Sequence, residues 1–172
     1  AAFMYKGYWE DIGTISSYYN ANLSLTSNQL GLNLYNEVLP IYAHNHYLPG
    51  ARVENAIINN SIICDGTIIE AKEISHSIIG VRGVIKEGTI IKHSLILGNE
   101  YYLSPEKQDL PFVIGKNCLI KNAIIDENVT IGDNVRLTNE KKYQSYDSKG
   151  VFIRDGIIII ASGTSVPDNF IL

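Results

Sequence analysis

Aliphatic residues recur every six positions over most of this chain, and this repeat limits the possible folds more than any other feature. The rows with this spacing are Ile62, Ile68 and Ile74; Ile78, Val84, Ile90 and Ile96; and Val113, Leu119, Ile125, Ile131 and Leu137. An amphipathic helix would repeat every 3.6 residues and an ordinary strand every two. A fixed period of six is instead typical of a solenoid, and it predicts a triangular coil of three short strands with about 18 residues per turn and about five turns.

The interior and the corners of such a coil need different residues. We expect one branched aliphatic side chain of every six to point inward, because such residues suit both a strand and a narrow core. Tight corners favour residues that tolerate a positive φ. The corner residues expected here are Gly66, Gly88, Gly115 and Gly132, beside Asp65, Asp133 and Asn134. A single coil has no core of its own, so the coils are expected to be stable only as a stack.

Two polar, tyrosine-containing stretches interrupt the repeat, at residues 99–112 and 140–150. They are predicted to be loops that leave the coil, with the repeat resuming at Val113 and, less regularly, over residues 151–160. The open ends of the stack carry unpaired strand edges that need cover. We expect the amino-terminal segment to cover one end, and residues 165–172 or another subunit to cover the other.

The first part of the chain lacks the repeat and has the spacing of a short helix. The residues on one face of this predicted helix are Ile15, Tyr18, Tyr19 and Leu23. Thr14 is the expected N-cap and Gly31 the expected breaker. Residues 33–49, which include two prolines, are predicted to form an irregular linker. The predicted division is therefore into residues 1–46 and residues 47–172.

Composition and charge argue against several classes of protein. Apolar residues make up 45% of the 172 residues and charged residues 19%, which predicts a folded chain with no membrane span. A net charge of −4 argues against nucleic acid as a partner, because phosphate binding needs a concentrated basic surface. Cys64 and Cys118 stand outside any zinc-ligand spacing, and we expect them to be reduced packing residues.

Several motifs in the chain resemble one enzyme family. The octet GYWEDIGT at residues 7–14 resembles the end of the catalytic domain of sugar-nucleotide pyrophosphorylases. The segment YNANL at 19–23 is similar to the helix that follows in one branch of them, the glucose-1-phosphate adenylyltransferases. Further motifs of that branch are IIGVR at 78–82, GTII at 88–91, LGNEYY at 97–102, IGKNCLIKNAIID at 114–126 and IGDNV at 131–135. The resemblance covers nearly the whole chain.

The resemblance implies a mainly β fold. This fold is a left-handed parallel β-helix of hexapeptide repeats, preceded by a short helix-containing remnant of an α/β nucleotidyltransferase domain. The chain is then expected to be the carboxy-terminal part of an enzyme that makes ADP-glucose and pyrophosphate from ATP and glucose 1-phosphate with Mg²⁺. Because the glycine-rich nucleotide loop belongs to the amino-terminal domain of that family, this chain alone is expected to be inactive. The implied location is cytoplasmic, or plastid if the source is plant-like.

One site residue follows from the motif WxD(I/V)GT. In the family the aspartate of this motif is a magnesium ligand near the sugar phosphate, and by position this residue is Asp11. A hard cation prefers carboxylate oxygen, which fits the residue type. The alternative is that Asp11 supports only the turn before the helix, where a negative charge is favourable.

The resemblance also implies a homotetramer with allosteric sites at the domain boundary. Plant-type members carry an activator-binding lysine in the motif IIDKN, where this chain has Glu127, and a second lysine where it has Ser162. A carboxylate repels a phosphorylated activator, so we expect weak or absent activation by 3-phosphoglycerate. The remaining candidate anion or effector contacts, which are otherwise solvated corner charges, are Arg82, Lys116, Lys121 and Arg136.

Two other functions remain open at this point. Hexapeptide-repeat acyltransferases use a histidine as general base, and His76 and His93 are spaced so that they lie close together on adjacent coils. Against that function, an acyltransferase has no need of the GYWEDIGT octet. The chain also fits a noncatalytic regulatory subunit, a type that the resembled family includes.

Overall fold

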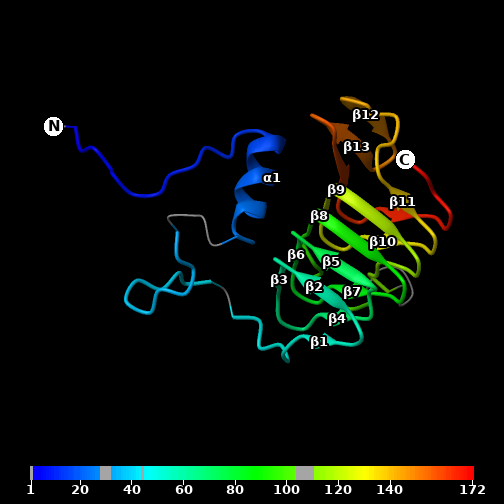
Figure 1. The fold of residues 1–172 in the computed structure, drawn as a ribbon, viewed down its shortest axis with the longest axis horizontal. Helices are drawn as coiled ribbons and strands as arrows, with labels where there is room; N and C mark the ends of the chain where they lie inside the picture. The colour runs from blue at the N-terminus through cyan, green and yellow to red at the C-terminus, as the bar shows by residue number, and fades with distance from the viewer. Residues whose placement is uncertain (1, 28–31, 44, 104–110) are drawn as a thin grey trace.

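The structure is a computed structural model that describes residues 2–27, 32–43, 45–103 and 111–172. Helix α1 (Ile15–Ser24) precedes a stack of short strands (Figure 1). The strands are β1 (Arg52–Val53), β2 (Ile57–Asn59), β3 (Ile62–Ile63), β4 (Ile68–Ile69), β5 (Glu73–Ser75), β6 (Ile78–Ile79), β7 (Val84–Ile85), β8 (Ile90–Ile96), β9 (Leu119–Ile125), β10 (Thr130–Ile131), β11 (Arg136–Leu137), β12 (Ser145–Ser148), β13 (Val151–Arg154), β14 (Ile157–Ile160) and β15 (Ser165–Val166). The predicted breaker Gly31 lies outside the described residues.

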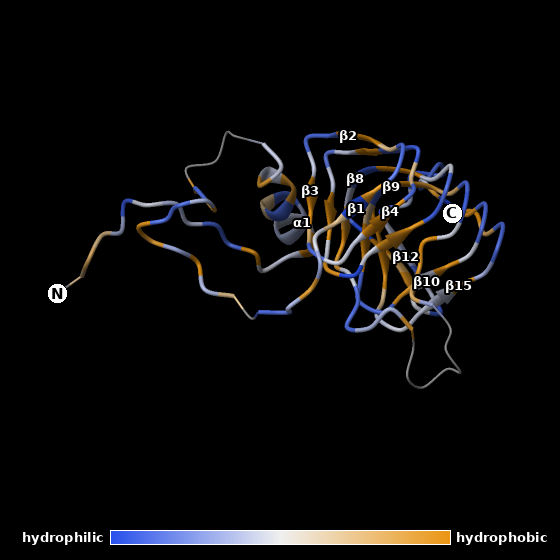
Figure 2. Ribbon diagram, turned by 90° about the horizontal axis from the view of Figure 1, so that it is seen from below, coloured by the Kyte–Doolittle hydropathy of each residue, from blue (hydrophilic) through white to orange (hydrophobic). Residues whose placement is uncertain are grey.

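The strands stack in parallel on three faces, as the repeat predicts. The first face runs β1, β4, β7, the single residue Ile114, β10 and β15. The second face runs β2, β5, the first halves of β8 and β9, and β11. The third face runs β3, β6, the second halves of β8 and β9, and β14. The predicted parallel β-helix is therefore confirmed, and its apolar strands and polar corners are visible in Figure 2.

The uninterrupted turns of the coil are shorter than the 18 residues expected from the repeat. Glu73 pairs with Ile90, which lies 17 residues later, and Ile57 pairs with Glu73, which lies 16 residues later. The step from the second to the third face is short, because the buried Ile74 and Ile79 are only five positions apart. In the 16-residue turn the step from Ile69 to Ile74 is equally short. A strict six-residue row therefore drifts between the inside and the outside of the coil.

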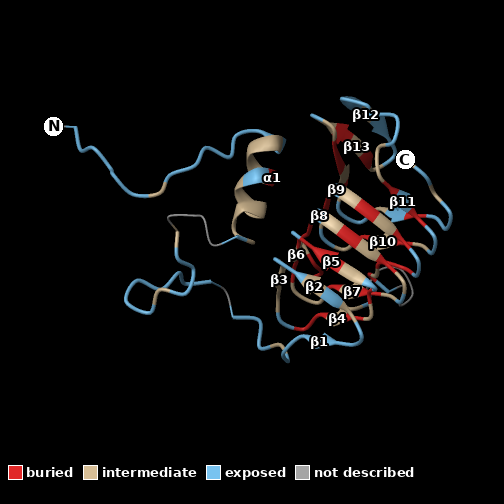
Figure 3. Ribbon diagram, in the orientation of Figure 1, coloured by how far each residue is buried: buried red, intermediate tan, exposed pale blue. Residues whose placement is uncertain are grey.

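This drift corrects the predicted inward rows. Ile79, Ile85 and Ile91 are completely buried, and this is the row that points inward. Figure 3 colours the ribbon by burial and shows buried stretches recurring along the strands of the coil. The residues one position earlier are Ile78, Val84 and Ile90, which are only half-buried. Successive side chains of a strand point to opposite faces, so these earlier residues point outward. The predicted rows are right only where they coincide with the buried row, as at Ile96, Ile125, Ile131 and Leu137.

The predicted corner glycines fall into two groups. Gly66 and Gly88 have φ values of 71° and 76°, in the region that favours glycine. Gly115 is needed for close approach instead, since a Cβ there would lie 2.5 Å from the backbone oxygen of Gly132 on the next coil. The positive φ in these later coils is adopted by asparagines such as Asn117 and Asn134.

The first interruption stays attached to the coil at its base. Tyr102 donates a hydrogen bond from its hydroxyl to the carbonyl of Gly66 at 2.8 Å, and Leu103 bridges to Pro111. Of the loop predicted at 99–112, residues 104–110 lie outside the described residues.

The second interruption is a hairpin, which corrects the loop predicted at 140–150. Strand β12 pairs with β13, and β13 pairs antiparallel with β14. The predicted resumption of the repeat at 151 is therefore wrong, because Gly150 and Gly156 turn the chain twice before it re-enters the coil at β14. Val151 and Ile153 are buried in the core at its carboxy-terminal end. Phe170 and Leu172, in the predicted end cover of residues 165–172, are partly buried and pack against this core.

Helix α1 forms as predicted but covers a side of the coil instead of an end. Thr14 is the N-cap, and it shares a capping box with Ser17. Tyr19 packs with Leu95 and Ile124 on the outside of the third face. At the amino-terminal end of the stack, Val53, in register with the buried Ile69, is still 45% exposed. The outward aliphatic residues of the third face explain the difference, since they form an apolar surface that α1 buries.

Candidate functional site

Asp11 lies in the extended segment immediately before helix α1. Its carboxylate Oδ1 accepts a hydrogen bond from the Gly13 backbone N–H at 3.0 Å, and the side chain is exposed. This contact supports the turn into the helix. The other oxygen, Oδ2, makes no hydrogen bond within the described part of the chain, which leaves an oxygen donor of the type that Mg²⁺ prefers.

One carboxylate does not complete a magnesium site. Among the described residues, no group of three or more histidine, cysteine, aspartate or glutamate side chains is placed to hold a metal ion. The residue type of Asp11 therefore fits Mg²⁺, and the other ligands would have to come from beyond this chain.

Helix α1 ties the Asp11 segment to the third face of the coil. Asp11 is three residues before the N-cap Thr14. Tyr19 is 8% exposed, and its hydroxyl donates a hydrogen bond to the backbone carbonyl of His93 at 2.5 Å. The short connection means that the docking of α1 sets where Asp11 lies relative to the coil.

One corner of the coil gathers three carboxylates. Asp126 accepts a hydrogen bond from the backbone N–H of Ser162 on the next coil at 3.2 Å, and the Gly163 N–H donates to the Glu127 carbonyl. Glu100 joins the corner through Asn128, whose side-chain oxygen accepts from the Glu100 N–H at 2.9 Å. Within the described residues, none of the three carboxylates is paired with a lysine or arginine.

The four candidate anion contacts do not converge. Arg82 donates from Nη1 to the carbonyl of Asn99 at 3.3 Å, at the corner between the third and first faces. Arg136, on the second face, lies 3.2 Å from Glu140. Lys121, where the second and third faces meet, has no ion pair in the described part of the chain.

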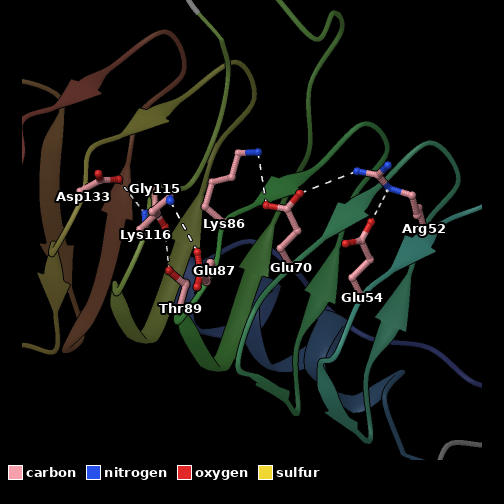
Figure 4. A network of polar contacts seen from close by, with 9 residues as sticks. All are labelled: Arg52, Glu54, Glu70, Lys86, Glu87, Thr89, Gly115, Lys116 and Asp133. Atoms are coloured by element: carbon pink, nitrogen blue, oxygen red, sulfur yellow. Dashed lines mark hydrogen bonds and ion pairs between the residues drawn. The ribbon is translucent and has the colours of Figure 1, made fainter.

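Lys116 belongs to a ladder of polar contacts along the first face (Figure 4). Its Nζ lies 3.5 Å from Glu87 Oε2, and its backbone N–H donates to Asp133 Oδ1 at 2.7 Å. On earlier coils, Glu70 lies 3.4 Å from Lys86 and 3.7 Å from Arg52. Exposed pairs of this kind contribute little to stability individually. Sequence reasoning missed it because the 16-residue spacing of Glu54, Glu70 and Lys86 is visible only once the turn length is known.

The two histidines lie close together, as their spacing predicts. The rings of His76 and His93 are stacked, with centroids 4.9 Å apart and an interplanar angle of 8°. Both residues are exposed. The two cysteines are free, with Cys118 buried and Cys64 half-buried, and burial raises the pKa of both thiols.

The sequence of this chain matches a family model and a known enzyme subunit. A family model described as the GLGC left-handed parallel beta-helix domain matches residues 46–171. The small subunit of glucose-1-phosphate adenylyltransferase from Triticum aestivum, chloroplastic/amyloplastic, is 39% identical over 181 residues. The chain belongs to the glucose-1-phosphate adenylyltransferase family. The match covers 99% of this chain but only 38% of the wheat protein.

The coil is assigned a left-handed sense, because the matching family model describes a left-handed parallel β-helix. The structure also places Glu127 and Ser162 on neighbouring coils at the carboxylate corner. Within the described residues, no helix is long and apolar enough to cross a membrane.

The contact of Tyr19 with the coil predicts an unusual titration. Burial raises the pKa of Tyr19 to about 12, from an ordinary value of 10.0. Since the folded-state pKa is raised, the contribution of this phenol to stability is complete below pH 10 and is lost as the pH rises toward 12. We expect ultraviolet titration of the tyrosines to show one late-ionising group that is absent in Tyr19→Phe. If the late group persists in that variant, Tyr19 does not hold α1 on the coil in this way.

Proposed function

We propose that this chain is the carboxy-terminal assembly and regulatory part of an enzyme that makes ADP-glucose and pyrophosphate from ATP and glucose 1-phosphate. The observation that carries the proposal is the 39% identity to the wheat small subunit over 99% of this chain, which includes the GYWEDIGT segment. Residues 1–46 would then end the nucleotidyltransferase domain, and residues 47–172 would form the β-helix domain. For a plant-like source the location is the plastid, and otherwise the cytoplasm.

Asp11 is the site residue that this chain would contribute. Its exposed carboxylate, with one oxygen uncommitted, would help to hold Mg²⁺ together with ligands of the amino-terminal domain. A magnesium ion bound there offsets the negative charge that develops between the phosphates during nucleotidyl transfer. The hydrogen bond from Gly13 and the capped start of α1 orient the Asp11 side chain.

The β-helix would serve assembly and regulation. Its coils share one hydrophobic core, and α1 connects that stack directly to the segment that carries Asp11. A tetramer is proposed by analogy with the family. Mass measurement of the parent protein in solution tests this assembly, with a mass four times that of the polypeptide as the expected result and a monomer as the contrary one.

The catalytic part of the proposal is tested by comparing the chain with its longer parent. We expect the parent polypeptide to release pyrophosphate from ATP when glucose 1-phosphate and Mg²⁺ are present. The 172-residue chain alone is expected to release none, because the residues that bind the nucleotide lie elsewhere in the family. Activity of the isolated chain would contradict this division of roles.

The carboxylate corner predicts a weak response to a phosphorylated activator. Glu127 stands where the resembled sequences carry a lysine, and no cation offsets it among the described residues. We expect saturating 3-phosphoglycerate to change the rate of the parent enzyme less than about twofold, whereas an effective allosteric coupling gives about 5–150-fold. The variant Glu127→Lys with Ser162→Lys is expected to gain a response, since both changes put cations at one corner. Strong activation of the unaltered enzyme would contradict the expectation.

A further inference from the structure

The stacked histidines occupy a column of corner residues with an unusual backbone. At the corner between the second and third faces, successive coils place Asn60, His76, His93 and Asn122 in register. All four have positive φ values, between 44° and 50°. Asparagine adopts this backbone region readily, so the corner itself explains the asparagines. Histidine is also enriched in this backbone region, so the backbone permits the two consecutive histidines without requiring them.

The surroundings of the two rings leave nitrogen atoms available. His76 Nε2 lies 3.3 Å from the Asn60 side-chain nitrogen, and neither ring contacts a carboxylate within the described residues. The neighbouring charged groups are Lys92, which is paired with Glu73 at 2.7 Å, and Lys121. The pKa of His93 lies below its usual value, chiefly because the ring is partly buried and to a smaller extent because of the charges of His76 and Lys92. A neutral imidazole is the form that binds a metal.

We propose that His76 and His93 form a two-histidine site for a divalent transition-metal ion of the zinc, nickel or copper class. Imidazole nitrogen suits these ions, whereas Mg²⁺ prefers oxygen, so the site is distinct in its chemistry from the one proposed at Asp11. Two imidazoles on a tetrahedral ion with bonds of about 2.1 Å need nitrogens about 3.4 Å apart. The rings are parallel, with centroids 4.9 Å apart, so both must rotate about their side-chain bonds before two ring nitrogens can converge on one ion.

The corner that carries the two rings is open to solvent. Both rings face solvent, so water can supply the other ligands and the ion has a direct path to the site. The rings come from adjacent coils, and a bound ion would join them across the stack. The same His93 residue accepts the Tyr19 hydroxyl at its backbone carbonyl, so the site lies directly beside the docked helix α1.

The test is a calorimetric titration of the 172-residue chain with zinc chloride, with magnesium chloride as the comparison. We expect one zinc ion per chain and no magnesium binding at this corner. His76→Asn and His93→Asn each place at that position the residue found elsewhere in the column, so both variants are expected to fold. Each should weaken zinc binding at least about tenfold, since loss of one ligand removes the chelate advantage. His46→Asn is the matched control and should bind zinc as the unaltered chain does.

Two results would contradict the proposed zinc site at His76 and His93. One is the absence of zinc binding at millimolar zinc, and the other is binding that survives both His76→Asn and His93→Asn. If either variant fails to fold, nitrogen NMR of the histidine rings in the unaltered chain decides the question. Zinc must then shift ring nitrogen resonances of both His76 and His93, and a shift of neither contradicts the proposal.

Discussion

Replacing Asp11 with asparagine is expected to lower the turnover of the parent enzyme about a hundredfold or more, without changing its thermal unfolding. The loss follows because a neutral amide is a poor ligand for Mg²⁺ compared with a carboxylate, and charge stabilisation is a large part of such catalysis. Stability should be kept because Asp11 is exposed and its contact is with the Gly13 N–H, which the asparagine oxygen also accepts. Steady-state kinetics over a range of Mg²⁺ concentrations measures the effect.

Glu10→Gln is the matched control for this prediction. Glu10 is an exposed neighbouring carboxylate, and in an extended segment it points away from Asp11. We expect its loss to leave turnover nearly unchanged. If Asp11→Asn keeps full turnover and the same Mg²⁺ requirement, Asp11 supports only the turn before α1.

Replacing Ile91 with alanine is expected to lower the free energy of unfolding by about 2–5 kcal/mol, because it leaves a cavity in the narrow core of the coil. Ile91 is completely buried, whereas Ile90, the residue before it, is half-buried and faces outward. Ile90→Ala should therefore cost less than about 1.5 kcal/mol. Chemical denaturation of the 172-residue chain compares the two.

This pair of variants also distinguishes the two possible inward rows. The strict six-residue row contains Ile90, and the observed buried row contains Ile91. A larger loss of stability for Ile90→Ala than for Ile91→Ala would contradict the packing of the coil described here.

The period of six was sufficient to predict the solenoid, but it could not predict which residue of each aliphatic pair points inward. In pairs such as Ile78–Ile79 and Ile90–Ile91 both residues are aliphatic, so the pattern of hydrophobic residues does not separate inside from outside. The short step of five positions from Ile74 to Ile79 settles the choice.

The sequence also predicted the contacts around the candidate sites only in part. The pairing of His76 with His93 was predictable from their 17-residue spacing, which is one turn of the coil. The docking of α1 on the third face was not, because the outward Leu95 and Ile124 resemble core residues in sequence. The antiparallel strand β13 was missed for a related reason, since Val151 and Ile153 look like a continued repeat.

The most direct test of the proposed function is pyrophosphate release by the parent protein with glucose 1-phosphate and Mg²⁺, comparing ATP with GTP and UTP. We expect turnover with ATP that exceeds turnover with either other nucleotide, and we expect ADP-glucose as the product. A preference for GTP or UTP would place the chain in an enzyme with another nucleotide substrate. No turnover with any of the three would contradict the proposed enzyme and favour a noncatalytic regulatory subunit.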